Sequence, residues 1–351
     1  MHNETSVNSP GPNISENFEA INYLPKWFPT AGRAVSNVVC YTGFILNFLI
    51  ALVLLKNRHL RKEGLTPCIV SLTLANIILY TCGIGYKLSK HVISPKTQTR
   101  CQTYGMITFI SMLCSAINLF GIAALRCVKF NFSTKFENRT FQKASILTAI
   151  ISWAAAFLIL MPTATGNWGQ FGWECKSKRC RFINYDNDGT LQTTAPEKLY
   201  YGLLISIGIF NLVMNLGTYI KVKIDCNKTA SDIEMFDLDA AQRVLEKEKK
   251  VTKMLVVDSA QYLALFLPKA ILQLKDPNSP NNQPLTHLIF FTIWYISGLI
   301  EALVILLFQR KYRKEIWTTL QSICQCTKKE SNSFNATISR RKTFESRNKT
   351  R

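Results

Sequence analysis

The chain has 351 residues, of which 48% are hydrophobic, and its 42 Lys and Arg residues outnumber its 22 Asp and Glu residues. Such a basic balance would suit nucleic acid or an anionic membrane. The apolar residues, however, lie in long blocks separated by short basic stretches, which is typical of a multi-span membrane protein and excludes a soluble nucleic-acid-binding fold with a basic face.

The N-terminal stretch, residues 1–32, is polar and has no early apolar core followed by a cleavage site, so no cleaved signal peptide is predicted. Acceptor sequons for N-glycosylation begin at Asn3 and Asn13. We expect this tail to be extracellular and to be glycosylated at both asparagines.

Seven apolar blocks follow, each near the ~20 residues that cross a bilayer. Hydrocarbon offers no partner for a backbone N–H or C=O group, so these blocks must be helices. The predicted fold is an all-α membrane protein, a bundle of seven transmembrane helices within residues 33–308. The blocks cover residues 33–55, 65–88, 102–127, 144–165, 199–220, 251–273 and 284–308.

Basic residues indicate the orientation of the bundle. They are concentrated in the connections 56–62, 129–143, 221–250 and 310–314. By the positive-inside rule these connections are cytoplasmic, which places the N-terminus outside and predicts a multi-pass protein of the plasma membrane. The inner connection 221–250 is interpreted as a charged loop whose last part, from Asp239 to Lys250, extends the sixth helix.

The chain after the seventh block divides into a helix and a tail. Residues 309–323 place Tyr312, Ile316 and Leu320 on one face opposite charged residues, which predicts a short helix in the membrane interface. Cys324 and Cys326 follow it and are either sites of S-palmitoylation or free thiols. The tail, residues 324–351, is rich in Ser, Thr, Lys and Arg; we expect it to be disordered, cytoplasmic and phosphorylated to recruit arrestin.

The third block carries Cys101 at its outer end and Arg126 at its inner end. This combination resembles the rhodopsin-like (class A) G-protein-coupled receptors, in which a disulfide cysteine and an activation arginine bracket the third helix. The outer loop "GNWGQFGWECKSKRC" resembles the moody and trapped-in-endoderm receptors, which are related to melatonin and medium-chain fatty-acid receptors. Further family positions are matched by Asn47, by "SLTLAN" ending at Asn76, by Trp153, by Tyr219 and by "LFLP" with Phe266 and Pro268.

The resemblance implies a receptor that passes an extracellular ligand signal to heterotrimeric G proteins by helix rearrangement. Three cysteines lie on the oxidising outer side, where disulfides form. We expect a Cys101–Cys180 bond that leaves Cys175 odd; three free thiols are the alternative.

Arg126 is the expected activation switch. Glu248 occupies the family's lock position on the sixth helix, so an Arg126–Glu248 pair would tie two helices together at the inner end until a G-protein peptide enters. Tyr219, Phe266 and Pro268 occupy other positions of the same switch. A snorkelling interfacial arginine is the alternative interpretation of Arg126.

The chain departs from the family at the switch. Leu125 replaces the acid that precedes the arginine, and the Asn-Pro-x-x-Tyr motif of the seventh helix reads Glu301 to Ile305. Ordinary switching is therefore in doubt, and a decoy or a constitutively active receptor is the main variant of this function.

Glu301 is an intramembrane carboxylate, a feature that is usually functional. The family has an acid on the second helix and an asparagine on the seventh, whereas this chain has Asn76 on the second and Glu301 on the seventh. With Asn47 and Ser115 they would form a wet pocket for Na⁺ or a proton, or Glu301 would be neutral and hydrogen-bonded because burial favours the protonated acid. Na⁺ in the core is the one candidate ion, and no other cofactor or metal is predicted.

Thr108 stands where the family's amine receptors carry an aspartate, so an amine ligand is not expected. Lys87, Lys269 and His287 lie toward the outer half instead. A buried lysine is costly unless it meets an anion. We therefore expect an anionic lipid or a small acid as ligand; the alternatives for Lys269 are snorkelling or pairing with a loop acid.

A membrane transporter or channel and a membrane enzyme are the other two candidate classes of protein. Transporters favour internal repeats and a path of intramembrane charges, and this chain has no repeat, with Asp258, Lys269 and Glu301 as its prominent charges. An enzyme needs a nucleophile with its base, a phosphate loop or a metal motif, and none occurs among the motifs of this sequence.

Overall fold

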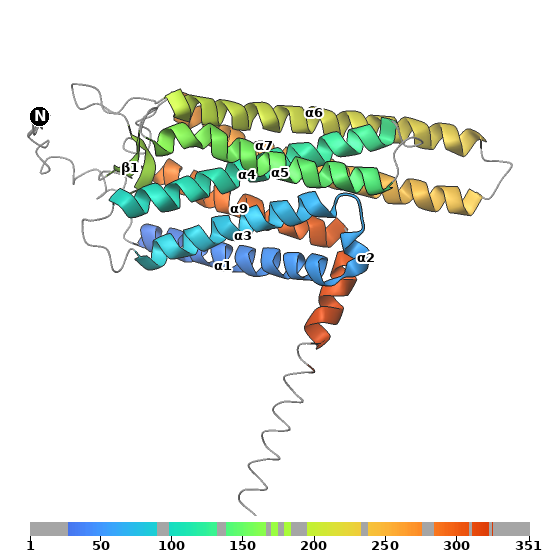
Figure 1. Cartoon of the computed structure of the whole chain (residues 1–351), viewed down its shortest axis with the longest axis horizontal. Helices are drawn as coiled ribbons and strands as arrows, with labels where there is room; N and C mark the ends of the chain where they lie inside the picture. Colours follow the sequence, from blue (N-terminus) through green and yellow to red (C-terminus); the bar gives the residue numbers. More distant parts are fainter. Residues whose placement is uncertain are drawn as a thin grey trace, which may run out of the picture.

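The computed structural model describes residues 27–89, 98–131, 138–165, 170–174, 179–183, 195–232, 238–275, 284–308, 311–322 and 325. Long helices lie alongside one another in a single bundle (Figure 1). Predictions for Asn3, Asn13, Cys175, Cys324 and Cys326 fall outside the described residues.

Seven long helices correspond to the seven predicted blocks, which confirms the predicted fold class. A one-turn helix, α2 (Arg58–Arg61), joins the first two and begins after Asn57, whose side chain accepts hydrogen bonds from two backbone N–H groups. A further helix covers residues 311–322. The long helices are α1 (Trp27–Lys56), α3 (Thr66–Ser89), α4 (Gln98–Asn131), α5 (Asn138–Ala164), α6 (Ala195–Asp232), α7 (Leu238–Lys275) and α9 (Pro284–Phe308).

The inner connection between the fifth and sixth helices differs from its prediction. Helix α6 continues to Asp232, so the interpretation of residues 221–232 as a loop was wrong. The stretch after Gly217 contains no glycine or proline as far as Asp232, and nothing in it stops a helix. Helix α7 begins at Leu238, and the segment from Asp239 to Lys250 is helical as predicted.

The outer loop also differs, because part of it forms strands. Strands β1 (Gln170–Glu174) and β2 (Arg179–Ile183) pair antiparallel, with Gly172 opposite Arg181. This hairpin lies against α4. The sequence predicted only a polar loop here, and the short alternation of polar and apolar residues in Gln170–Glu174 and Arg179–Ile183 was interpreted as part of that loop.

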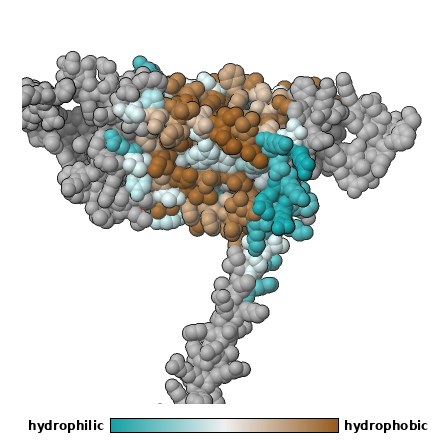
Figure 2. Space-filling view, in the orientation of Figure 1, coloured by the Kyte–Doolittle hydropathy of each residue, from teal (hydrophilic) through white to brown (hydrophobic). Residues whose placement is uncertain are grey.

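The outer surface of the bundle is apolar. Among the residues that the structure describes, five helical stretches are long and apolar enough to cross a bilayer: Ala34–Lys56, Thr66–Ile84, Gln102–Lys129, Arg139–Thr163 and Glu197–Ile224. Large apolar side chains such as Leu158 and Phe210 are more than 60% exposed on this surface. Figure 2 shows a broad hydrophobic band, with hydrophilic residues gathered on the side of α2. Contact between these apolar side chains and water is unfavourable, so we expect lipid chains to surround this band.

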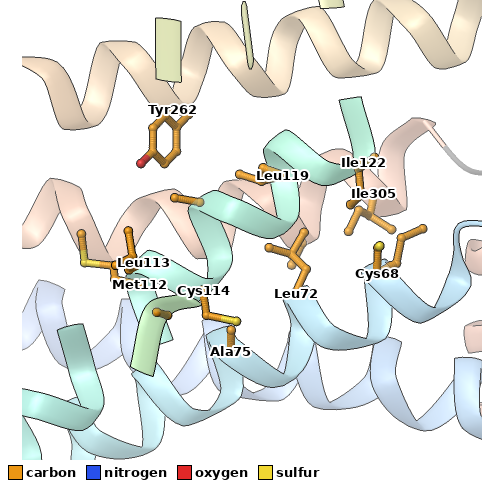
Figure 3. Close-up of a cluster of buried hydrophobic side chains, with 14 of the residues drawn as sticks. Cys68, Leu72, Ala75, Met112, Leu113, Cys114, Leu119, Ile122, Tyr262 and Ile305 are labelled. Carbon is orange, nitrogen blue, oxygen red and sulfur yellow. The ribbon is translucent and has the colours of Figure 1, made fainter. Parts of the chain in front are cut away.

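The core is organised around α4. This helix packs against α3, α5 and α6, and its side chains form the centre of the largest buried cluster, shown in Figure 3. Leu72 and Cys68 of α3, Leu113 and Ile122 of α4, and Ile305 of α9 meet there. The apolar cluster fixes the helices that carry the polar groups described next.

Candidate functional site

Four polar side chains from four helices meet inside the bundle. The Asn76 amide donates to Glu301 Oε2 at 2.8 Å and to Asn47 Oδ1 at 3.4 Å. The Ser115 hydroxyl donates to Asn76 Oδ1 at 3.4 Å. All four side chains are buried, Glu301 being 4% exposed. The structure thus brings together the residues predicted to form the polar pocket, and we call this group the polar core.

The polar core offers oxygen atoms of the kind that a hard cation prefers. Its carboxylate, amide and hydroxyl oxygens belong to residues that contact one another within hydrogen-bonding distance. The same carboxyl could instead hold a proton. The residues therefore fit both candidate occupants, Na⁺ and H⁺.

Close helix contacts surround the polar core. Tyr80 is fully buried, and its hydroxyl donates to the Tyr295 carbonyl at 2.8 Å. Its ring lies on Gly43 of α1, and its hydroxyl lies beside Gly298 of α9. Asn47 donates to the carbonyls of both glycines, at 2.9 Å to Gly43 and 3.4 Å to Gly298. These contacts hold α1, α3 and α9 in register around Glu301.

A second polar group joins α3, α4 and α5 nearer the inner side. Ser71 Oγ accepts hydrogen bonds from Trp153 Nε1 and from the Asn118 amide, both at 3.0 Å. One helical turn away, the Cys68 thiol donates to the Ser145 carbonyl at 3.1 Å. Trp153, which the sequence identified only as a family position, therefore has a defined structural role.

The seam between α6 and α7 also contains buried polar side chains. The Asn215 amide donates to Asn211 Oδ1 at 2.9 Å and to Ser259 Oγ at 2.6 Å. The Asn215–Asn211 bond lies within α6, whereas the Asn215–Ser259 bond crosses to α7. In hydrocarbon such interhelical bonds hold helices together.

Aromatic side chains fill the bundle above the polar core. Phe266 is 8% exposed and stacks on Tyr262, with ring centroids 4.4 Å apart. Phe109 of α4 contacts Tyr200 of α6 at 4.8 Å. Pro268 lies inside α7 and is exposed on the outer surface of the bundle.

The outer half holds charged groups on facing helices. Lys269 of α7 is 5% exposed. One turn further out, Gln273 donates to Glu197 Oε1 of α6 at 2.8 Å, and both side chains are buried. The Thr108 hydroxyl donates to the Tyr104 carbonyl of its own helix at 2.7 Å. The side chains of Lys87 and His287, on α3 and α9, lie outside the described part of the chain.

Arg126 lies buried near the C-terminal end of α4, the end predicted to be cytoplasmic, and it is 7% exposed. It is one of the charged groups that act electrostatically on Tyr312 of the helix over residues 311–322. Glu63 is another such group, and its Oε1 forms an ion pair with Lys311 Nζ at 2.7 Å. Burial, and then the nearby Glu63 carboxylate, raises the pKa of Tyr312 to about 12.

Two predicted pairs are placed only by their backbone. Glu248 lies on α7, but its side chain is outside the described residues, so the Arg126–Glu248 pair stays a prediction. The same holds for the side chains of Cys101, on α4, and Cys180, on β2, although these two elements contact one another. Tyr219 lies partly buried on α6.

Sequence reasoning missed several functional candidates. Glu197, Gln273, Asn215 and Tyr262 each lie within or beside an apolar block, and no local pattern separates them from neighbouring positions. The signal available was their polarity, since intramembrane polar residues usually face another helix. Their partners could not be named, because those lie on other helices.

Comparisons with known proteins agree with this architecture. The chain matches the family described as 7 transmembrane receptor (rhodopsin family) over residues 46–298. It is 21% identical to protein trapped in endoderm-1 of Drosophila melanogaster over 81% of this chain and 76% of that protein. It is 22% identical to neuropeptide FF receptor 2 of Mus musculus over 82% of this chain and 71% of that one. Squid rhodopsin superposes with a TM-score of 0.68 at 14% identity, covering 91% of this chain and 92% of the other.

Proposed function

Because this chain belongs to the rhodopsin family of seven-transmembrane receptors, we propose that it transmits an extracellular ligand signal to a heterotrimeric G protein by rearranging its helices. It is a receptor rather than an enzyme, and a multi-pass membrane protein. The proposal extends to the plasma membrane as its location, with the N-terminus outside.

The observation that carries the proposal is the burial of Arg126 at the inner end of the central helix. A guanidinium 7% exposed beside the membrane is costly unless surrounding groups hold it. Movement of α7 away from α4 would expose this group to a partner. Arg126 would then leave Glu248 on α7 and contact the G protein.

The polar core supports helix rearrangement. It links α1, α3, α4 and α9 through one amide, that of Asn76, so a change in the charge of Glu301 alters the contacts of all four helices. Na⁺ or a proton bound there would stabilise one arrangement of the bundle over another. We propose a cation or proton as the regulator of this receptor.

The ligand class is proposed from Lys269. A ligand with an acidic group, such as an anionic lipid or a small acid, would enter the outer half and contact its ammonium group. Glu197 is a resident carboxylate one turn away along the seam, so an acidic ligand would have to compete with it for the ammonium group. An acidic agonist that keeps its potency on a Lys269→Ala receptor would exclude Lys269 as the contact for its acidic group.

The experiment that tests the function is nucleotide exchange. Purified receptor in lipid nanodiscs is mixed with each class of heterotrimeric G protein, with and without acidic lipids. We expect exchange by at least one class and its loss in Arg126→Ala. Arg139→Ala, which removes an exposed arginine from the same end of the bundle, is the matched control and should retain exchange.

A constitutively active receptor is the second candidate, favoured by Leu125. This residue, where the family has an acid, packs its side chain against the apolar core. It therefore provides no carboxylate to hold Arg126 at rest. High ligand-free exchange that falls in Leu125→Asp would identify this variant, whereas a decoy would bind G protein without exchange.

A further inference from the structure

The hydroxyl of Tyr262 has no hydrogen-bond partner among the residues that the structure describes. The side chain is 4% exposed and points from α7 into the bundle, toward Met112 and Leu113 of α4 (Figure 3). A buried hydroxyl that bonds to nothing destabilises the arrangement in which it occurs. Any second arrangement that supplies an acceptor is favoured by comparison.

Glu301 is the acceptor that we infer for this hydroxyl. Its carboxylate is the charged group that acts electrostatically on Tyr262. The adjacent residue, Gln261, donates to the Ser297 carbonyl at 3.2 Å, which places this turn of α7 against the turn of α9 that precedes Glu301. A carboxylate has about four acceptor positions, so it can take a phenol in addition to the Asn76 amide.

The ring of Tyr262 is fixed to its surroundings so that its hydroxyl moves with α7. It stacks on Phe266 of the same helix, with an angle of 26° between the rings. Its other neighbour is Gly208 of α6, where an added Cβ would lie 3.0 Å from Tyr262 Cε1. In the described arrangement Ser259, one turn before Tyr262, is bonded to Asn215 of α6 at 2.6 Å. A shift of α7 would break that bond and carry the hydroxyl with it.

We propose that Tyr262 is a reserve hydrogen-bond donor, which reaches the Glu301 carboxylate when α7 shifts and so links α7 to the polar core. The inference rests on the proposed receptor function, and it states how a shift of α7 changes the hydrogen bonds of the polar core. The proton stays on the tyrosine, and no covalent bond changes. Tyr262 is therefore a positioning residue, whose hydroxyl stabilises the signalling arrangement and destabilises the resting one.

The test is Tyr262→Phe, which keeps the ring and removes the hydroxyl. The two readouts should change in opposite directions. The Tm of the resting receptor in nanodiscs should rise by about 2–4 °C, because a buried unsatisfied group is gone. G-protein nucleotide exchange should fall about tenfold, because the signalling arrangement loses a charge-assisted hydrogen bond.

Tyr200→Phe is the matched control. Tyr200 is also a buried tyrosine of the same region, but its hydroxyl donates to Met112 Sδ at 3.4 Å. Its removal should leave the Tm unchanged or lower, with exchange retained. In a Glu301→Gln receptor, whose neutral amide is a weaker acceptor, Tyr262→Phe should change exchange by less than in the wild type.

Either of two results would overturn the inference: a Tm that falls in Tyr262→Phe, or exchange equal to that of the wild type. Failure of the proposed function gives a different pattern, with no exchange by the wild-type receptor. In that case a fluorophore at Lys253→Cys, an exposed position of α7, decides the inference. Two populations of fluorescence lifetime in the labelled wild type, of which Tyr262→Phe loses the minor one, would support the inference. Unchanged lifetime populations in Tyr262→Phe would overturn it.

Discussion

Gly43 makes the closest helix contact beside the polar core, and we expect Gly43→Ala to lower the stability of the receptor substantially. An added Cβ would lie 2.6 and 2.7 Å from Cε2 and Cε1 of Tyr80. Ordinary carbon–carbon contacts need about 3.5–4.0 Å, so the ring or the helix must move by about 1 Å. Tyr80 cannot turn away easily, because it is fully buried and its hydroxyl is bonded to Tyr295.

The expected cost of Gly43→Ala follows from these contacts. Overpacking costs about 1–3 kcal/mol, and the contact distances place this site at the upper end. Loss of the Tyr80 hydrogen bond would add about 1 kcal/mol. A cost of about 3–4 kcal/mol lowers the Tm by about 6–16 °C. The assay is thermal unfolding of purified receptor in detergent, followed by intrinsic tryptophan fluorescence.

Gly217→Ala is the matched control for this prediction. Gly217 is an exposed residue of α6, and an added Cβ there would meet nothing within 4 Å. Alanine favours a helix by up to about 1 kcal/mol over glycine, so the Tm should stay or rise. Equal Tm values for Gly43→Ala and wild type would refute the packing argument. Gly43→Ala should also be partly rescued by Tyr80→Leu, since a smaller side chain relieves the overlap.

Three further outcomes are expected. Replacing choline by Na⁺ at about 100 times its Kd should stabilise the wild type by about 2.7 kcal/mol and leave Glu301→Gln unchanged; stabilisation of both would place the ion elsewhere. In a double-mutant cycle of thermal stability, Asn215→Val and Ser259→Ala should couple by about 0.6–1.7 kcal/mol, and additive losses would show that their bond contributes nothing. The raised pKa of Tyr312, about 12 against an ordinary 10, means that the unfolded chain ionises first, so stability present below about pH 10 should fall toward pH 12. Tyr312→Phe should lose less stability than wild type between pH 9 and 11 as measured by Tm, and an equal loss would contradict the assignment.

Several sequence predictions concerned local features, and the structure shows why they could be made. The helical blocks follow from continuous runs of apolar residues, and helix α9 begins at Pro284 and ends at Phe308 as predicted. The inner extension of α6 to Asp232 was missed because its charges were interpreted as a loop, although no residue there breaks a helix. The β1–β2 hairpin was missed although its five-residue strands alternate in polarity, because the polar stretch around them was interpreted as a loop.

The polar core was predicted only in part. Asn47, Asn76, Ser115 and Glu301 were grouped through the family resemblance, and the structure brings them together. The grouping of Tyr262 with Glu301, and of Glu197 with Gln273, could not be predicted. The two members of each group lie on different helices, whose rotation about their own axes is set by packing in the bundle, and no local sequence pattern predicts that rotation.

The sequence by itself indicated which segments cross the membrane and which polar residues lie within the hydrocarbon, and it carries the prediction of which side is cytoplasmic. These properties depend on hydropathy and charge over windows of about twenty residues. Only the tertiary structure decided which polar groups meet, because Asn76 and Glu301 are 225 residues apart in the chain and 2.8 Å apart in space. Close packing on glycines such as Gly43 and Gly298 fixes that meeting, and with it the place where a cation or a proton would act.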